Sequence, residues 1–196
     1  MERHDLQELH YITPICNVPS ILQHGLLSNV RAARHRPASV AMQEIQDRRA
    51  RVAVPGGRRL HKYVNLYICA RNPMLYKRLD QRDQLCVLSI SPDVLDLANV
   101  VVTDGNASGD YVRFAAAPAG LAIVNRELTF AEYWTDPDVI QYYRKKSAKC
   151  AEVLVPDRVD PRYLRCAYVW SEDVRQRLQA NAGALQVVVN SHLFFA

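Results

Sequence analysis

The sequence lacks the features that place a chain in a membrane or in a common nucleotide-binding fold. No apolar run is long enough to span a bilayer, and the charged N-terminus has no apolar signal-peptide stretch. The glycine-rich patterns G-x-G-x-x-G and G-x-x-x-x-G-K-[ST] are both missing. We therefore expect a cytoplasmic protein with no membrane partner, in which neither a Rossmann turn nor a P-loop holds any bound nucleotide.

Cysteines are few and carry no recognisable pattern. The five are odd in number and widely scattered, and no C-x-x-C pair is present to hold zinc or form a redox couple. We expect them to be reduced and mostly buried, and we expect no metal site. They are Cys16, Cys69, Cys86, Cys150 and Cys166.

Length and composition are those of an ordinary soluble domain. The chain has 196 residues, of which 49% are hydrophobic and 23% charged, and it contains no internal repeat. Enough material is present to bury a substantial core. We expect residues 1–196 to form one domain and the protein to be monomeric.

The expected secondary structure is short and mixed. Helices are expected at 18–24, 40–51, part of 128–143 and 171–180, with Asn17, Ser39 and Ser171 as N-caps and Gly25 just past the first helix. Because helices collect early and strands late, the fold class is α+β. Strands are expected at 8–13, 63–69, 85–90, 100–103, 150–155, 164–169 and 185–189.

A single acidic residue interrupts one apolar strand. If side chains alternate there, Ala151, Val153 and Val155 share one face, and Glu152 lies on the other face with apolar neighbours. A carboxylate in such surroundings costs several kcal/mol without a partner, so Glu152 should line a cleft or meet a cation. The alternative is an edge-strand glutamate that faces water.

Positive charge is concentrated in residues 31–62. Nine basic residues face only two acidic ones there, a net +7, although the whole chain carries only +5. Such a concentration indicates a polyanionic partner. The basic residues are Arg31, Arg34, Arg36, Arg48, Arg49, Arg51, Arg58, Arg59 and Lys62.

Two adjacent arginines lie on the helix expected at 40–51. Arg48 and Arg49 are about 100° apart around a helix axis, so we expect one to point inward and the other to face solvent. A fully solvated helix in which Asp47 pairs with Arg51 is the alternative. That alternative explains Arg51 well and Arg49 poorly.

Six blocks in this order resemble the DarT family, the DNA ADP-ribosyltransferase toxins of bacterial toxin–antitoxin systems. The resemblance spans nearly the whole chain, and its most specific part is the R-N-P-M-L-Y block together with the arginine pair and the A-E-x-L-V strand. The blocks are His10-Tyr11-Ile12-Thr13, residues 17–25, Ile45-Gln46-Asp47-Arg48-Arg49, Leu60-His61-x-Tyr63-Val64, Tyr67-Ile68-x-x-Arg71-Asn72-Pro73-Met74-Leu75-Tyr76 and Ala151-Glu152-Val153-Leu154-Val155.

The resemblance implies a fold, a co-substrate and partners. The fold would be a split antiparallel sheet around an NAD cleft, with flanking helices. The activity would be transfer of ADP-ribose from NAD, without a metal, to thymidine or guanosine in single-stranded DNA. A macrodomain-type antitoxin that removes the modification is the implied protein partner.

The resemblance also implies which residues contact NAD. Family members often have Tyr-His-Ile-Thr where this chain has His10-Tyr11-Ile12-Thr13, so Tyr11 takes the cofactor-facing position and His10 the opposite face. For Thr13 and Ser28, ordinary turn capping is an equally open reading. The implied cofactor contacts are Tyr11, Ile12, Thr13, Ser20, Ser28, Arg49 and Tyr67.

Glu152 and Arg49 are the expected catalytic pair. Breaking the glycosidic bond of NAD develops positive charge on the ribose, which an ionised Glu152 would stabilise while holding a ribose hydroxyl. Arg49 could bind the pyrophosphate or the nicotinamide ribose. The resemblance adds a part in deprotonating the acceptor, but a guanidinium is a poor base, and binding is the favoured role.

Two further segments could contact DNA. The Arg71-Asn72-Pro73 turn would bring Met74 and Tyr76 to the rim of the cleft, where a base stacked on an aromatic ring gains roughly 1–3 kcal/mol; these side chains could equally be core. Arg144, Lys145, Lys146 and Lys149 precede Glu152 and are either a phosphate path or a solvated loop. His61 is interpreted as structural.

Two other functions remain open. The same fold could transfer ADP-ribose, or a related phosphate-containing group, to RNA or protein, since a fold does not fix the acceptor. Alternatively, the chain could be a nucleic-acid-binding module without catalysis, as the basic segment and a pI near 9.0 would allow. A binding module has no need of a carboxylate on an apolar strand, so Glu152 and Arg49 favour an enzyme.

Overall fold

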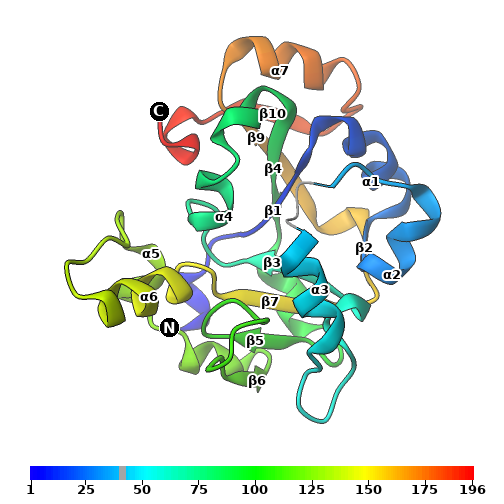
Figure 1. Cartoon of the computed structure of the whole chain (residues 1–196). Helices are drawn as coiled ribbons and strands as arrows, with labels where there is room; N and C mark the ends of the chain where they lie inside the picture. The colour runs from blue at the N-terminus through cyan, green and yellow to red at the C-terminus, as the bar shows by residue number, and fades with distance from the viewer. Residues whose placement is uncertain (40–42) are drawn as a thin grey trace.

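A mostly antiparallel sheet organises the molecule (Figure 1). The structure, a computed structural model, describes residues 1–39 and 43–196, and within them the main sheet has eight strands in the order β10-β9-β4-β1-β3-β7-β5-β6. Only β9 and β10 pair in parallel among these, and β2 and β8 form a small second sheet. The strands are β1 (Leu9–Pro14), β2 (Leu26–Leu27), β3 (Tyr63–Tyr67), β4 (Leu85–Ile90), β5 (Val101–Thr103), β6 (Phe114–Ala116), β7 (Glu152–Pro156), β8 (Arg158–Val159), β9 (Leu164–Val169) and β10 (Gln186–Val189).

Short helices surround this sheet. In Figure 1, α7 lies beside β9 and β10, α5 and α6 lie together at one edge, and α3 lies in front of β3 and β7. None of the helices within the described residues combines the length and apolar character needed to cross a bilayer. The helices are α1 (Val18–His24), α2 (Asn29–Ala32), α3 (Gln43–Arg51), α4 (Pro73–Tyr76), α5 (Arg126–Phe130), α6 (Val139–Ala148) and α7 (Glu172–Gln179).

The expected α+β class is confirmed, although its elements are interleaved along the chain rather than divided into early helices and late strands. The predicted bounds of α1, β4 and β9 are correct. The single helical stretch expected within 128–143 is two helices, α5 and α6. The predicted helix start at 40–42 lies outside the described residues.

The two testable helix caps differ in outcome. The Ser171 hydroxyl accepts the Val174 N–H at 3.4 Å and caps α7 as predicted. Asn17 occupies the N-cap position of α1 as predicted, but its side chain makes no capping hydrogen bond, because a 3₁₀ turn at Ile15–Asn17 runs directly into the helix. The Asn17 amide instead donates to the Thr13 hydroxyl at 3.1 Å and to the Ala38 carbonyl at 2.8 Å.

The main sheet is split between β1 and β3. Strand β1 pairs with β4 through six residues and β3 pairs with β7 through five, but among the described residues β1 and β3 meet at the single pair His10–Tyr67. The two strands therefore diverge beyond that point. Backbone groups along the facing edges of β1 and β3 border the resulting gap instead of pairing with each other.

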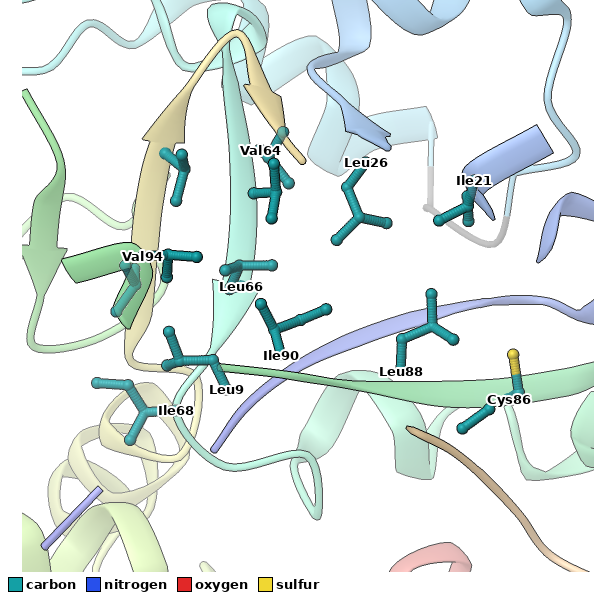
Figure 2. Close-up of a cluster of buried hydrophobic side chains, with 14 of the residues drawn as sticks. Leu9, Ile21, Leu26, Val64, Leu66, Ile68, Cys86, Leu88, Ile90 and Val94 are labelled. Carbon is teal, nitrogen blue, oxygen red and sulfur yellow. The ribbon is translucent and has the colours of Figure 1, made fainter. Parts of the chain in front are cut away.

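The principal hydrophobic core lies on one face of both halves of the sheet. Figure 2 shows Leu9, Leu66, Leu88 and Ile90 from β1, β3 and β4 gathered with Leu26 of β2. Ala151, Val153 and Val155 join this core, and Cys150 and Leu154 belong to other clusters, as the alternation around Glu152 predicts. Glu152 thus faces away from the main core, in register with Tyr67 and Thr103.

Gly25 ends α1 at a position that only glycine can occupy. Its φ is +81° and its ψ is 178°, and an added Cβ would lie 2.2 Å from the Val159 carbonyl oxygen. Gly25→Ala is therefore expected to lower the free energy of unfolding by about 2–4 kcal/mol, through backbone strain and the clash with β8. Urea denaturation of the variant and the parent protein measures this loss.

Gly183 is the matched control for this substitution. Its φ is +54°, but an added Cβ would meet nothing within 4 Å. Gly183→Ala should cost only the left-handed backbone penalty of about 1–2 kcal/mol. Equal losses for the two variants would contradict the importance of the close approach between Gly25 and β8.

Candidate active site

A buried ion pair lies at the join of the two sheet halves. Glu152 is 0% exposed and Arg49 is 5% exposed. Nη1 of Arg49 donates to both carboxylate oxygens of Glu152, at 3.2 and 3.1 Å, and the Ala107 N–H donates to Oε1 at 3.4 Å. Removing either partner would leave an uncompensated buried charge. The expectation that Glu152 meets a cation is confirmed, and the water-facing alternative is wrong.

The ionisation of Glu152 is a balance of opposing effects. Burial raises the pKa of the carboxyl, while the charge of Arg49 and the Ala107 N–H lower it, and the net pKa lies above the ordinary value of 4.5. Arg49 therefore stabilises the carboxylate form in a site that disfavours charge.

Helix geometry separates the two adjacent arginines as predicted. Arg49 points inward from α3 to Glu152. The Arg48 side chain is 49% exposed, and its guanidinium lies 3.9 Å from Glu44 one turn earlier. The fully solvated helix is therefore excluded, because one of its arginines is buried in the site.

A cavity of about 1050 Å³ opens at the split in the sheet. Its size is at the upper end for small-molecule sites, and its wall mixes apolar and polar groups. Figure 1 shows that β1, β3, α1, α2 and α3 converge around this region. Lining residues come from all of these elements, from α4 and α6, and from the loop after β5; they include Tyr11–Pro14, Ser20, Asn29, Ile45, Gln46, Arg48, Arg49, His61, Tyr63, Asn65, Tyr67, Met74, Lys77, Asn106, Asp110, Tyr143, Lys146 and Ser147.

Most of the expected cofactor contacts lie on this wall. Tyr11, Ile12, Ser20 and Tyr67 line the cavity. Burial and the nearby Glu152 charge raise the pKa of Tyr67 well above its ordinary value, so its hydroxyl stays protonated. The His10 ring is not among the described lining groups and lies 3.2 Å from Glu8.

Thr13 and Ser28 have different surroundings. Thr13 lines the cavity, and its hydroxyl already accepts a hydrogen bond from Asn17. Ser28 precedes α2 and is buried, but it is not among the described residues that line the cavity. Its hydroxyl makes no capping bond to α2 and has no hydrogen-bond partner within the described part of the chain. Simple capping therefore does not account for Ser28.

The segment at Arg71–Tyr76 lies partly at the cavity and partly beside it. Met74 lines the cavity, whereas Tyr76 is 53% exposed and packs edge-on against Trp134 and Phe195. Arg71 donates to the carbonyls of His192 and Glu132, at 3.2 and 2.9 Å. Arg71 therefore ties the C-terminal turn to the segment that follows α5.

The basic residues of α6 have different environments. Lys146 lines the cavity, Arg144 is exposed, and Lys145 pairs with Asp136 at 2.7 Å. Neither the phosphate path nor the solvated loop holds for Lys149, which is 1% exposed and donates to the Ala131 carbonyl at 2.8 Å and to Cys69 Sγ at 3.2 Å. The chain turns inward at the end of α6, so this lysine enters the core before β7 begins.

Several cavity residues were not anticipated from the sequence. His61 was interpreted as structural, and Asn65, Lys77 and Tyr143 were not considered. One usable signal was present: Tyr143 is three residues before Lys146, so a helix puts both on one face. Within residues 1–39 and 43–196, no group of three His, Cys, Asp or Glu side chains is arranged to hold a metal.

Comparison with known proteins gives a consistent result. Residues 10–195 match the family model described as "ssDNA thymidine ADP-ribosyltransferase, DarT". A Thermosipho africanus protein named as a DNA ADP-ribosyl transferase–DNA ADP-ribosyl glycohydrolase fusion is 32% identical over 96% of this chain, which spans 50% of that protein. A DNA ADP-ribosyl transferase from Thermus aquaticus is 34% identical over 76% of this chain and 68% of its own length.

Solved structures show the same similarity. Thermus sp. 2.9 DarT in complex with ADP-ribosylated ssDNA superposes with a TM-score of 0.80 at 26% identity, covering 96% of each chain. Thermosipho africanus DarTG in complex with ADP-ribose superposes with a TM-score of 0.83 at 29% identity, covering 96% of this chain and 51% of that one.

The ion pair predicts a pH-dependent stability change. Arg49→Met should lower the free energy of unfolding by about 3–5 kcal/mol at neutral pH, because Glu152 is left buried without a cation. Without Arg49 the pKa of Glu152 rises further above its ordinary value of 4.5. The variant is therefore most stable below pH 4.5, where Glu152 is neutral in both the folded and the unfolded protein, and its free energy of unfolding falls as the pH rises. Denaturant titrations between pH 4 and 8 measure this slope.

Two variants serve as controls for that measurement. Arg48→Met removes an exposed arginine from the same helix and should change stability little. Arg49→Met combined with Glu152→Gln should be less sensitive to pH than Arg49→Met alone. An Arg49→Met loss that does not change with pH would show that Glu152 is not the responsible group.

Proposed function

The chain belongs to the DarT family, and on that premise we propose that it transfers ADP-ribose from NAD to a thymidine base of single-stranded DNA. The observation that carries the proposal is the buried Glu152–Arg49 pair beside a large cavity at the sheet split. The description of the family names thymidine, which supports thymidine over guanosine as the acceptor base. The whole of residues 1–196 would act as one transferase unit.

Glu152 supplies the electrostatic part of the reaction. As the bond between nicotinamide and ribose breaks, positive charge develops on the ribose, and a nearby carboxylate lowers the energy of that transition state. Its effect is large because water is excluded and the carboxylate is already oriented. Arg49 contributes by opposing the rise in the pKa of Glu152 that burial causes.

NAD would occupy the cavity between β1 and β3. Facing backbone edges at the split offer N–H and C=O groups to the polar parts of the cofactor, and the Arg49 guanidinium offers charge for a phosphate or ribose oxygen. A solved relative, Thermus sp. 2.9 DarT in complex with NAD+, supports NAD as the co-substrate. The proposed contacts on the cavity wall are Tyr11, Ile12, Thr13, Ser20, Arg49 and Tyr67. Ser28, which lies between the lining residues Leu27 and Asn29, is proposed to contact NAD from just behind that wall.

The rim of the cavity suits an unpaired base and its phosphates. Met74 and Tyr143 provide stacking surface, and Lys77 and Lys146 provide positive charge. Bases in a duplex must be unstacked before they can enter such a site, so single strands are the favoured acceptors. Arg71, Tyr76, Arg144 and Lys145 lie in the adjoining segments and complete the proposed DNA surface.

One relative supports a protein partner for this chain. The Thermosipho africanus protein joins a transferase to a DNA ADP-ribosyl glycohydrolase in one chain, and this chain spans half of it. We propose that the present protein acts as the toxin of a pair, as a monomer in the cytoplasm, opposed by a separate macrodomain-type antitoxin with glycohydrolase activity.

Incubation of the protein with NAD and oligonucleotides tests the proposed reaction. Mass spectrometry should detect one ADP-ribose on thymidine-containing single strands, with much slower labelling of duplex DNA and of matched RNA. Glu152→Gln should lower the rate at least about 100-fold, because it removes the charge that stabilises the transition state.

Glu172→Gln, on the exposed surface of α7, is the matched control and should label DNA at the parent rate. Labelling of RNA or protein as fast as DNA would contradict DNA as the acceptor, while the proposed ADP-ribosyltransferase activity would stand. Single-strand binding without any NAD consumption would favour a non-catalytic binding module.

The arginine pair gives a separate test of NAD binding. Arg49→Ala should weaken NAD binding strongly, because a buried guanidinium is lost from the cavity. Arg48→Ala should change it little: Arg48 also borders the cavity, but its side chain is half exposed and its guanidinium faces Glu44. Calorimetric titration with NAD compares the two variants. Equal or reversed losses would place NAD away from the Arg49 side of the cavity.

A further inference from the structure

Two buried polar atoms near the proposed active site have complementary chemistry. Nη2 of Arg49 is a hydrogen-bond donor, and Nε2 of His61 is an acceptor when the ring is neutral. Both atoms are buried, and neither has a hydrogen-bond partner within the described part of the chain. A buried donor or acceptor without a partner is unfavourable, and native proteins hold few such groups.

The His61 ring is held on the same helix face as Arg49. It lies in the 3₁₀ turn Leu60–Lys62, which packs against α3 and leads into β3. The ring hydrogen-bonds the backbone of Gln46, which precedes Arg49 by three residues on α3. Because Nε2 is the unpartnered nitrogen, Nδ1–H makes that bond, and the lone pair of Nε2 is available to accept.

The charges around His61 keep it neutral. Burial lowers the pKa of the ring below 6.5, and the positive charge of Arg49 lowers it further, against smaller opposing effects from the Gln46 hydrogen bond and Asp47. Helix α2 also packs against the Leu60–Lys62 turn, and its Arg31 pairs with Asp157. A neutral ring is the form that can accept a hydrogen bond from a guanidinium.

The free protein and the proposed reaction place different demands on Arg49. Its Nη1 engages both oxygens of Glu152, yet the proposed function needs one of those oxygens for a ribose hydroxyl. A guanidinium that rotates partly away from Glu152 needs a new acceptor, since it stays buried. His61 and Arg49 both line the cavity, and the charge of Arg49 acts directly on the ring.

We infer that His61 is the positioning residue for Arg49: in the NAD-bound state Nε2 of His61 accepts a hydrogen bond from Nη2 of Arg49, which frees one carboxylate oxygen of Glu152. The inference rests on the proposed function, because NAD supplies the ribose that takes over the carboxylate oxygen. It accounts for Nη2 of Arg49 and Nε2 of His61, two buried atoms that have no hydrogen-bond partner within the described part of the free protein.

Substitution of His61 separates positioning from simple structure. His61→Leu removes the acceptor and should lower kcat about 10- to 100-fold with little change in the KM for NAD, because a misplaced guanidinium mainly affects the transition state. His61→Gln places an amide oxygen near the position of Nε2 and should restore most of the rate. If His61→Leu turns over at the parent rate, or His61→Gln is as slow as His61→Leu, the inference is wrong.

The pH profile provides a readout that a structural role would not change. Because the pKa of His61 is lowered from its ordinary value of 6.5, the ring becomes protonated only at a more acidic pH, where it can no longer accept from Arg49 and repels it. The acid limb of kcat should therefore contain a contribution from His61 besides that of Glu152. In His61→Gln the acid limb should become less steep. His4→Gln is the control, since the His4 side chain is 83% exposed, and should keep the parent profile.

Nitrogen NMR of the parent protein tests the hydrogen bond without relying on turnover. Addition of NAD should shift the Nε2 resonance of His61 in the direction of a hydrogen-bonded acceptor. NAD that binds without shifting this resonance would overturn the inference and leave the proposed function intact. A protein that does not bind NAD at all would overturn the proposed function and the inference with it.

Discussion

The buried ion pair of Arg49 and Glu152 is the interaction on which the site depends. Either charge alone would carry a large desolvation cost, so the two can be buried only together. Their residues are 103 positions apart in the chain, and the pair joins α3 to the first residue of β7. The same contact that holds the helix over the sheet also favours the ionised form of the carboxylate.

The sheet supplies the rigid part of the molecule, and its split supplies the space. Strand β4 is buried along its whole length, and the main core lies behind β1, β3, β4 and β7. The gap between β1 and β3 is bordered by residues from 26–39 and 43–62, segments that together hold nine of the 25 Lys and Arg residues and only two acidic ones. A stable platform with a charged cover is a physical basis for binding an anionic dinucleotide without a glycine-rich loop.

Folding gives the basic residues different tasks, although their sequence neighbourhoods look alike. Arg49 is buried against Glu152, Arg58 pairs at the surface with Asp157, and Lys149 is buried against a carbonyl and a sulfur. Lys146, three residues before Lys149, lines the cavity. Net charge therefore indicates a polyanionic partner but does not identify the side chains that meet it.

Local periodicity determined a substantial part of the site. Strand alternation placed Glu152 away from the main core, the helical turn separated Arg49 from Arg48, and the strands at 85–90 and 164–169 follow from their own residues. The tertiary structure alone decided that Arg49 reaches Glu152, that β1 and β3 diverge after one pair, that Lys149 turns inward and that His61 borders the cavity. The physical reason is that the direction of a side chain depends on the local helix or strand geometry. The residue that it contacts in the interior depends on how segments far apart in the chain pack together.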